Sequence, residues 1–285
     1  MMQIEPFFDS VTATITYVVS DPSTGHCAII DSVHDFDLNS GALTSQSADK
    51  VIAYISKMNL HVEWILETHI HADHLSAASY LQSRLGGKIG IGEHIKSVLA
   101  YWAPIFNLGS DTPLDGSQFD VLFGDGMRFN IGNLTVNVIH TPGHTPDCIS
   151  YLVEDVIFVG DTIFMPYVGT GRADFPGGSA DDLYHSIQKI LALPEQTRIF
   201  TCHDYPPDGQ VPFWQSTVAE QRKLNIIVND SVTENEFVKI RHQRDLNKPV
   251  PKLLLPALQV NLRAGKLAQP EDNQVQYIKI PVNQM

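Results

Sequence analysis

Residues 67–80, ETHIHADHLSAASY, restrict how this chain can fold more than any other segment. Six consecutive positions hold three histidines and one aspartate: His69, His71, Asp73 and His74. The apolar run VEWIL before them predicts a buried strand, and the residues after them predict a helix. In the loop between, alternating side chains can point at one centre. Imidazole and carboxylate ligands without thiolates suit zinc, iron or manganese, so we interpret this segment as part of a metal site.

One loop cannot enclose a metal ion alone, and the chain offers three further candidates. His144 lies in TPGHT, Asp161 lies in FVGDT, and His203 lies in FTCHD. Each follows a short apolar run that reads as a strand, at the point where apolar residues give way to polar ones. Because loops at strand ends commonly carry ligands, we expect these three side chains to join the first four.

Predicted strands and helices alternate in two halves, and each half begins with strands. We expect a hairpin over 12–31, helices over 47–59, 74–87 and 94–106, strands within 119–161, a helix over 179–194, a strand over 197–204, helical segments over 213–228 and 233–246, and an extended Pro-rich tail. This order predicts an αββα sandwich, in which two mixed β-sheets pack together and helices cover both outer faces.

The net charge of −13 argues against nucleic acid or an anionic membrane as the main partner, because both require clustered Lys and Arg. The first residues, MMQIEPFFDS, show no secretory signal, and no apolar run is long enough for a transmembrane helix.

The three cysteines, Cys27, Cys148 and Cys202, form no C-x-x-C pair. We therefore expect a cytoplasmic protein without disulfides. Cys202 precedes His203 in a predicted strand, so we expect it to face the opposite way, into the core.

H-x-H-x-D-H followed by P-G-H-T, G-D-T and a late strand-end histidine resembles the metallo-β-lactamase superfamily over residues 10–210. The resemblance implies a catalytic domain over 1–210 and a helical and extended extension over 211–285, packed on the same domain. It also implies one metal position formed by His69, His71 and His144. A second would be formed by Asp73, His74 and His203, with Asp161 between the two.

Four activities of that superfamily can be compared with this chain. A β-lactamase is disfavoured because those enzymes commonly carry Cys at the position of Asp161 and are exported. A nuclease is disfavoured because the chain is acidic and has no clamping insertion between His144 and His203. A thioester hydrolase similar to glyoxalase II is an alternative that uses all seven ligands. Outside these four activities, a binding protein that has lost catalysis is disfavoured because none of the ligands is missing.

The segment after Asp161 favours the fourth activity, that of a glutathione persulfide dioxygenase. It reads GTGRADF followed by a Leu-Tyr pair, and it is similar to the G-x-[GA]-R-x-D-F segment of those enzymes. The segments CHDY, STVAEQRKLN and PKLLLPALQVNLRAGKLAQPEDN are also similar to persulfide-dioxygenase-like and "β-lactamase hydrolase-like" proteins. Some dioxygenases have Cys where this chain has Thr170, so a role for that thiol does not transfer.

By this resemblance His69, His144 and Asp161 would be the catalytic residues and would hold one Fe(II) per chain; zinc, one or two per chain, is the alternative. The substrate would be a small thiol derivative, glutathione persulfide or a glutathione thioester. Arg172 is our candidate for binding a glutathione carboxylate, with Tyr205 as the companion donor. An ion pair of Arg172 with Asp174 is the competing interpretation.

Imidazole ligands need partners at their second nitrogen, so we expect acceptors around the site. The sequence allows a homodimer but does not fix the oligomeric state.

Overall fold

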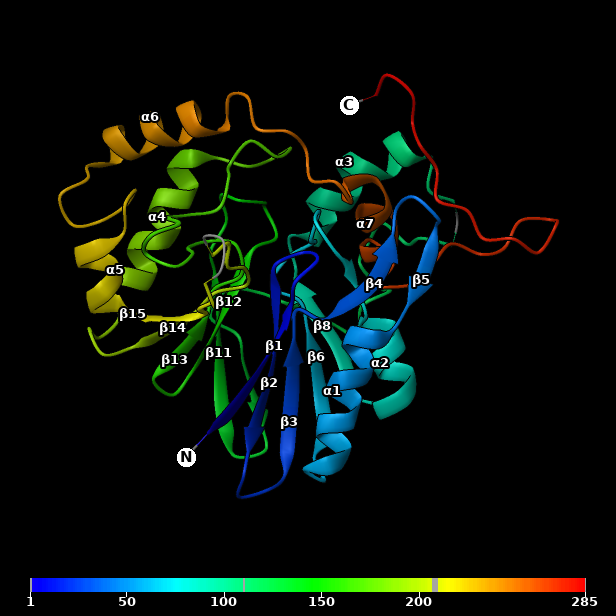
Figure 1. The fold of residues 1–285 in the computed structure, drawn as a ribbon, viewed down its shortest axis with the longest axis horizontal. Coiled ribbons are helices and arrows are strands. Elements are labelled where there is room, and N and C mark those ends of the chain that lie inside the picture. Colours follow the sequence, from blue (N-terminus) through cyan, green and yellow to red (C-terminus); the bar gives the residue numbers. More distant parts are fainter. Residues whose placement is uncertain (1, 110, 207–209, 285) are drawn as a thin grey trace.

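Two six-stranded β-sheets face each other, and helices cover their outer faces (Figure 1). The structure is a computed structural model that describes residues 2–109, 111–206 and 210–284. The first sheet has the strand order β1 (Gln3–Asp9), β2 (Thr14–Asp21), β3 (His26–Ile30), β6 (His61–Leu66), β8 (Lys88–Gly92) and β9 (Val121–Phe123). Strands β1 to β3 pair antiparallel, whereas β3, β6, β8 and β9 run parallel, so this sheet is mixed.

The second sheet is built from the later part of the chain. Its strand order is β10 (Arg128–Ile131), β11 (Leu134–His140), β12 (Ile149–Val153), β13 (Val156–Phe158), β14 (Arg198–Phe200) and β15 (Gln215–Thr217). Only β13 and β14 pair parallel; the other neighbours are antiparallel. A small third sheet has the order β5 (Ala42–Thr44), β4 (Val33–Asp37) and β7 (Leu75–Ser76).

The helices divide between the two outer faces. On the first sheet lie α1 (Gln46–Lys57), α2 (Ala78–Leu85), α3 (Ile95–Phe106) and α7 (Leu254–Asn261). On the second sheet lie α4 (Ala180–Leu191), α5 (Val218–Leu224) and α6 (Glu234–Asp245). Between the sheets, alternate side chains of both pack into one apolar layer that includes Ile15, Tyr17, Val136 and Tyr151. The predicted αββα sandwich is confirmed.

Local signals place several elements where the sequence predicts them. Ser179 caps α4 by accepting a hydrogen bond from the backbone N–H of Asp182, and Thr217 and Thr233 begin α5 and α6 with capping boxes. Three predictions are wrong. The segment 213–228 is not helical throughout, because residues 215–217 pair with β14 as strand β15 and α5 covers only Val218–Leu224. Residues 75–76 form strand β7, so α2 starts only at Ala78. The tail is not extended throughout, because residues 254–261 form α7, whose apolar face packs on the first sheet.

The loops that matter for function follow the carboxyl ends of β3, β6, β11, β13 and β14, which meet between the two sheets at one end of the sandwich. Across the part of the chain that the structure describes, no helix has both the length and the apolar character needed to cross a bilayer.

Candidate metal centre

All seven predicted ligands converge, and their ligand atoms form two groups. In each group the ligand atoms lie within 4.8 Å of one another. The first group, which we call the triad, consists of His69, His144 and Asp161. The second, which we call the tetrad, consists of His71, Asp73, His74 and His203. His71 is thus grouped with the tetrad, but its ring also lies beside that of His69, with centroids 4.2 Å apart, so its place in the first metal position stays a prediction.

In the triad, each imidazole is held through its Nδ1 atom. His69 Nδ1 lies 3.0 Å from Thr68 Oγ1. That hydroxyl donates to Asp31 Oδ2 at 2.9 Å, so it accepts the Nδ1 proton of His69. The Nδ1 of His144 donates to the carbonyl of Arg172 at 2.7 Å. Both contacts use Nδ1, so the Nε2 atoms of both rings are left to face a ligand, and His144 Nε2 lies 3.5 Å from Asp161 Oδ2.

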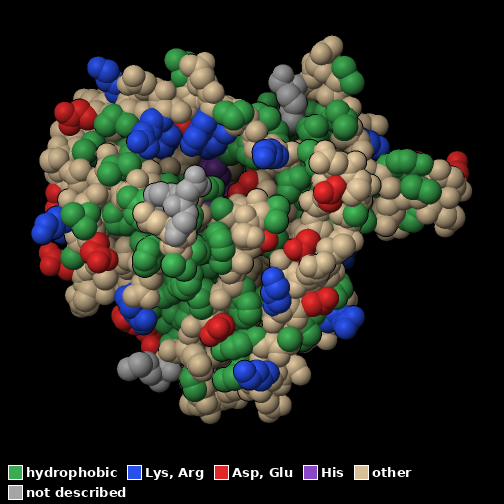
Figure 2. Space-filling model, viewed as in Figure 1, with side chains coloured by type: hydrophobic (Ala, Val, Ile, Leu, Met, Phe, Trp, Pro, Cys, Tyr) green, Lys and Arg blue, Asp and Glu red, His purple; other side chains and the backbone are tan. Residues whose placement is uncertain are grey.

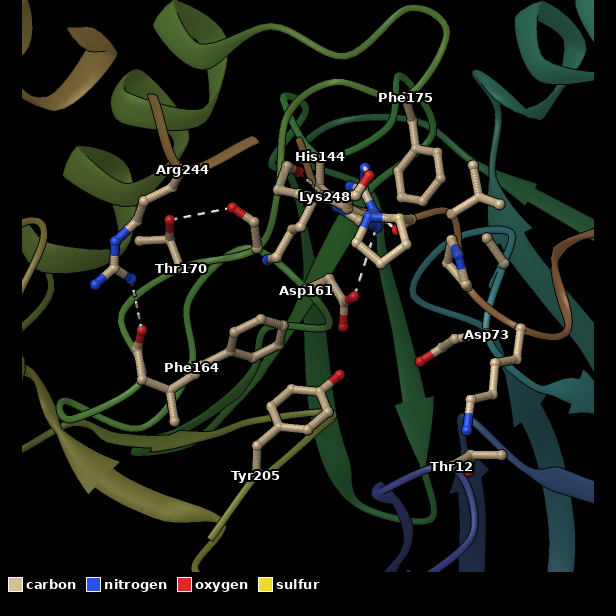
Figure 3. A pocket seen from close by; sticks show the side chains of 18 of the residues that line it. Thr12, Asp73, His144, Asp161, Phe164, Thr170, Phe175, Tyr205, Arg244 and Lys248 are labelled. Atoms are coloured by element: carbon tan, nitrogen blue, oxygen red, sulfur yellow. Dashed lines mark hydrogen bonds and ion pairs between the residues drawn. The ribbon is translucent and has the colours of Figure 1, made fainter. Parts of the chain in front are cut away.

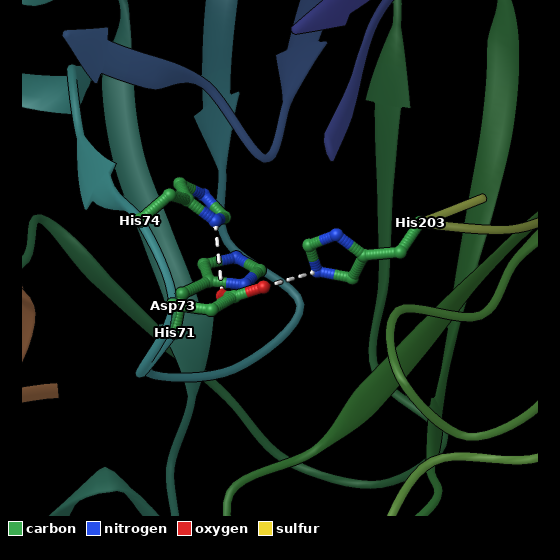
Figure 4. Close-up of side chains that lie close together, drawn as sticks. All are labelled: His71, Asp73, His74 and His203. Carbon is green, nitrogen blue, oxygen red and sulfur yellow. Dashed lines mark hydrogen bonds and ion pairs between the residues drawn. The ribbon is translucent and has the colours of Figure 1, made fainter. Parts of the chain in front are cut away.

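In the tetrad, Asp73 lies between two histidines (Figure 4). Its carboxylate oxygens lie 3.2 Å from His74 Nδ1 and 3.1 Å from His203 Nε2. The Nδ1 atoms of His74 and His203 also lie 3.3 Å from the hydroxyl of Thr14, which enters from the start of β2. All three histidines of the tetrad are fully buried.

A buried carboxylate that the sequence analysis missed supports both groups. Asp31 follows β3 and is 2% exposed. It accepts from the backbone N–H and the hydroxyl of Thr68, and its Oδ1 lies 3.0 Å from His71 Nε2. The second oxygen of Glu67 lies 3.3 Å from the same nitrogen. The signal in the sequence was the aspartate that closes the apolar run CAII, the same strand-end pattern that marks Asp161.

The pKa shifts follow from this arrangement. Burial and the neighbouring imidazoles lower the pKa of His69 well below its ordinary value, and burial also lowers that of His74. Burial opposes the charged form of His71, but Asp31 and Glu67 raise its pKa well above the ordinary value. For Asp73, burial favours the neutral acid, yet His203 and His74 lower its pKa. His69 and His74 are thus neutral and can offer a lone pair, while Asp73 is charged.

The donor set fits a divalent metal ion. Among the described residues, four buried polar atoms of the triad and the tetrad make no hydrogen bond: His71 Nδ1, His74 Nε2, Asp161 Oδ1 and His203 Nε2. The last two lie 3.4 Å from each other, and His203 Nε2 lies 3.1 Å from Asp73. Buried polar atoms are normally satisfied, so this cluster indicates a shared cation. The expected partners at the second imidazole nitrogens are also present.

The prediction for Cys202 is wrong in its direction. Strand β14 ends at Phe200, so strand alternation no longer applies two residues later. The thiol is buried, but its sulfur lies within 4.8 Å of ligand atoms of Asp161 and His203. Cys202 therefore lies against the metal centre.

A cavity of about 720 Å³ opens onto the centre (Figure 3). His144, Asp161 and Asp73 lie at its base, and Phe164 and Phe175 form apolar walls. Five cations also line it: Arg172, Arg241, Arg244, Lys248 and Lys252. Figure 2 shows Lys and Arg side chains gathered beside the recess in which a histidine is visible.

Arg172 and Tyr205, the predicted substrate-binding residues, both line this cavity. The guanidinium of Arg172 forms a two-pronged ion pair with Asp174, at 2.5 and 2.6 Å, and donates to the carbonyl of Pro249 at 2.8 Å. The competing ion pair is thus present, and the carboxylate-binding role of Arg172 stays a prediction. Tyr205 stacks on the His203 ring, and its hydroxyl points into the cavity between Asp161 and Asp73.

Comparisons with known proteins agree with this geometry. The profile described as "Metallo-beta-lactamase superfamily" matches residues 11–203. The chain is 52% identical to "Glyoxylase B2" of Dictyostelium discoideum, over 99% of this chain and 97% of that protein. It is 31% identical to "Persulfide dioxygenase ETHE1, mitochondrial" of Homo sapiens, over 92% and 88%. The crystal structure of ETHE1 from Myxococcus xanthus superposes with a TM-score of 0.74 at 28% identity, over 93% of this chain and 100% of that chain.

Proposed function

Since this chain belongs to the metallo-beta-lactamase superfamily, we propose that it is a persulfide dioxygenase that oxidises glutathione persulfide with O₂ at one Fe(II) held by the triad. One observation carries the proposal. The ligand atoms of two histidines and one carboxylate lie within 4.8 Å of one another, and two of the three residues line the cavity; the carboxylate, Asp161, also lies 3.4 Å from His203 of the tetrad. Such a facial triad is typical of non-haem Fe(II) oxygenases, because it leaves adjacent positions for O₂ and a substrate atom.

The overall reaction balances without another reductant or oxidant. Glutathione persulfide, O₂ and water give glutathione and sulfurous acid, which ionises to sulfite. The outer sulfur loses four electrons and O₂ gains four, while the sulfur–sulfur bond breaks and the inner sulfur leaves as the thiol. Bound at the triad, Fe(II) would supply the redox chemistry and the sites at which O₂ and sulfur meet.

The residues of the chain prepare that site. Thr68 and the carbonyl of Arg172 fix the two triad imidazoles, so that the Nε2 atoms of both rings are left to face a ligand. Burial of the hydroxyl and the charges of Asp161 and Asp73 raise the pKa of Tyr205, which keeps it a neutral donor toward an anionic sulfur. Phe164 and Phe175 give the cavity apolar walls beside the triad.

The cations that line the cavity favour a persulfide whose thiol carrier is an anion. Arg241 and Arg172 are neutralised by Asp245 and Asp174, but no described carboxylate lies within 4.0 Å of the charged groups of Arg244, Lys248 and Lys252. These three lie within residues 244–252, which we call the basic segment. Partial burial lowers the pKa of Lys248, and Arg241 adds to this effect while Asp245 opposes it. Glutathione carries two carboxylates remote from its sulfur and matches this arrangement.

A second candidate is a dinuclear thioester hydrolase similar to glyoxalase II. The observation that favours it is the complete tetrad, in which His71, His74 and His203 each keep an unpartnered nitrogen. Two metal ions could together lower the pKa of a water molecule and polarise a thioester carbonyl. The relative named "Glyoxylase B2" agrees with this alternative.

Metal analysis of anaerobically purified protein, combined with two assays, separates the candidates. We expect about one iron per chain, O₂ uptake with glutathione persulfide and sulfite as product. S-lactoylglutathione should be hydrolysed slowly or not at all. Two zinc ions per chain, no O₂ uptake and rapid hydrolysis of S-lactoylglutathione would contradict the dioxygenase and favour the hydrolase.

A further inference from the structure

The C-terminal helix α7 reaches the metal centre from a part of the chain far from every ligand. Its residues Ala257 and Val260 pack against Leu75 of the small sheet, directly after the H-x-H-x-D-H segment. Asn261, the last residue of α7, is 3% exposed. It does not line the cavity, so it has no route to a substrate.

The carboxamide of Asn261 makes three hydrogen bonds to backbone groups, two of them in the ligand loop and one in strand β7, which follows it. Its Nδ2 donates to the carbonyl oxygens of His71 at 2.8 Å and His74 at 2.9 Å. Its Oδ1 accepts from the backbone N–H of Ser76 at 2.7 Å. One side chain thus fixes the loop on both sides of Asp73.

The loop needs such a partner because it lacks regular secondary structure. Residues 68–74 belong to no helix or strand, so the hydrogen-bond pattern of a helix or sheet does not satisfy their backbone N–H and C=O groups. His71 and His74 are fully buried, so water does not readily replace a lost partner.

The hydrogen bonds that begin at Asn261 also lead, through Ser76 and Glu67, to the imidazole ring of His71. The hydroxyl of Ser76 donates to Glu67, whose other carboxylate oxygen lies 3.3 Å from His71 Nε2. Asn261 therefore positions His71 through its backbone and, by way of Ser76 and Glu67, through its ring.

We propose that Asn261 is a positioning residue of the metal centre, which sets the direction of His71 and His74 by clamping their carbonyl groups. Substitution should weaken metal binding beyond its effect on folding. The inference rests on the metal centre alone and holds for either reaction proposed above, so failure of the dioxygenase assignment would leave it intact.

The test compares two residues of the same helix. Gln259 is 4% exposed and also makes three hydrogen bonds through its carboxamide, but to Leu255 and Lys279 in the helix and the tail. Asn261→Ala and the equal-sized Asn261→Asp are compared with Gln259→Ala. For each, the release of zinc from the loaded protein to a colorimetric chelator is measured, together with the visible absorption of the Co(II)-loaded protein and the melting temperature of the metal-free protein.

We expect both Asn261 variants to release zinc at least about tenfold faster, the scale typical of residues that orient ligands. Their Co(II) spectra should change, because ligand directions change. Gln259→Ala should lower the melting temperature of the metal-free protein but keep wild-type release and spectrum. The proposal is overturned if Asn261→Asp, folded by circular dichroism, keeps wild-type release and spectrum, or if Gln259→Ala releases zinc equally fast.

Discussion

The triad and the tetrad use the same two residue types, yet the protein surrounds them differently. Two of the three triad residues, His144 and Asp161, line the cavity, and both triad imidazoles are tied back through Nδ1 to Thr68 and a carbonyl. In the tetrad, three histidines are fully buried and Asp73 contacts two other members.

The difference is one of degree, because two of the three triad residues and one of the four tetrad residues, Asp73, line the cavity. The three tetrad histidines lie away from the cavity, beside the carboxylates of Asp73, Asp31 and Glu67. In the proposed dioxygenase, the triad would be the part that the substrate reaches. If one metal ion is sufficient, the triad should be essential and the tetrad only helpful; if two are needed, both should be essential. The following predictions test that division.

The largest expected effect comes from removing one carboxylate of each group. Asp161→Asn should lower O₂ uptake with glutathione persulfide by more than about a hundredfold and remove most of the iron. Asp73→Asn, a substitution of identical size, should lower uptake by about tenfold or less. Steady-state kinetics and iron content measure both. Equal and complete loss in the two variants would contradict a mononuclear site.

Asp31→Asn should have the next largest effect, because Asp31 contacts Thr68, which holds His69 of the triad, and also contacts His71 of the tetrad. It accepts from Thr68 and lies beside His71 Nε2. We expect metal affinity to fall by about 10- to 100-fold, measured by competition with a chelator. Unchanged affinity would mean that the Asp31 contacts do not orient the ligands.

Thr68 contacts a histidine of the triad and Glu67 contacts a histidine of the tetrad, so substituting each one separately compares the two groups more finely. Thr68→Val removes the partner of His69 Nδ1 in the triad, whereas Glu67→Gln removes the carboxylate beside His71 in the tetrad. For the dioxygenase we expect about a tenfold loss of activity in Thr68→Val and a threefold loss or less in Glu67→Gln. The reverse order would assign the chemistry to the tetrad.

The smallest effects should come from the mouth of the cavity. Arg172→Ala should raise KM about fivefold with little change in kcat, because Arg172 holds the carbonyls of Lys248 and Pro249 and so positions the basic segment. Lys248→Ala should raise KM similarly. If Arg172 acts through the basic segment, the double variant should be less than additive. Arg198→Ala, which breaks a surface pair with Asp155, serves as control and should leave KM unchanged.

Much of the fold could be predicted because its signals are local. The hairpin ending at Asp31, the capped helices α4 and α6, and the strands β10 to β13 follow from periodicity and from caps. Strand β7 and helix α7 could not. Two residues are too few for a strand pattern, and α7 is placed by packing against the first sheet. The division into residues 1–210 and 211–285 stays a prediction; β15, from the later part, pairs with β14 of the second sheet.

The sequence by itself determined the seven candidate ligands, because each is a polar side chain at or just after the end of an apolar run, and that pattern is legible over a few residues. Only the tertiary structure decided how they divide into triad and tetrad, that Arg172 pairs with Asp174, that Cys202 lies against the centre, and that Asp31 and Asn261 hold the ligands. The physical reason is distance along the chain. Asn261 meets carbonyls 187 and 190 residues away, and such contacts exist only once the packed sheets and helices bring the segments together.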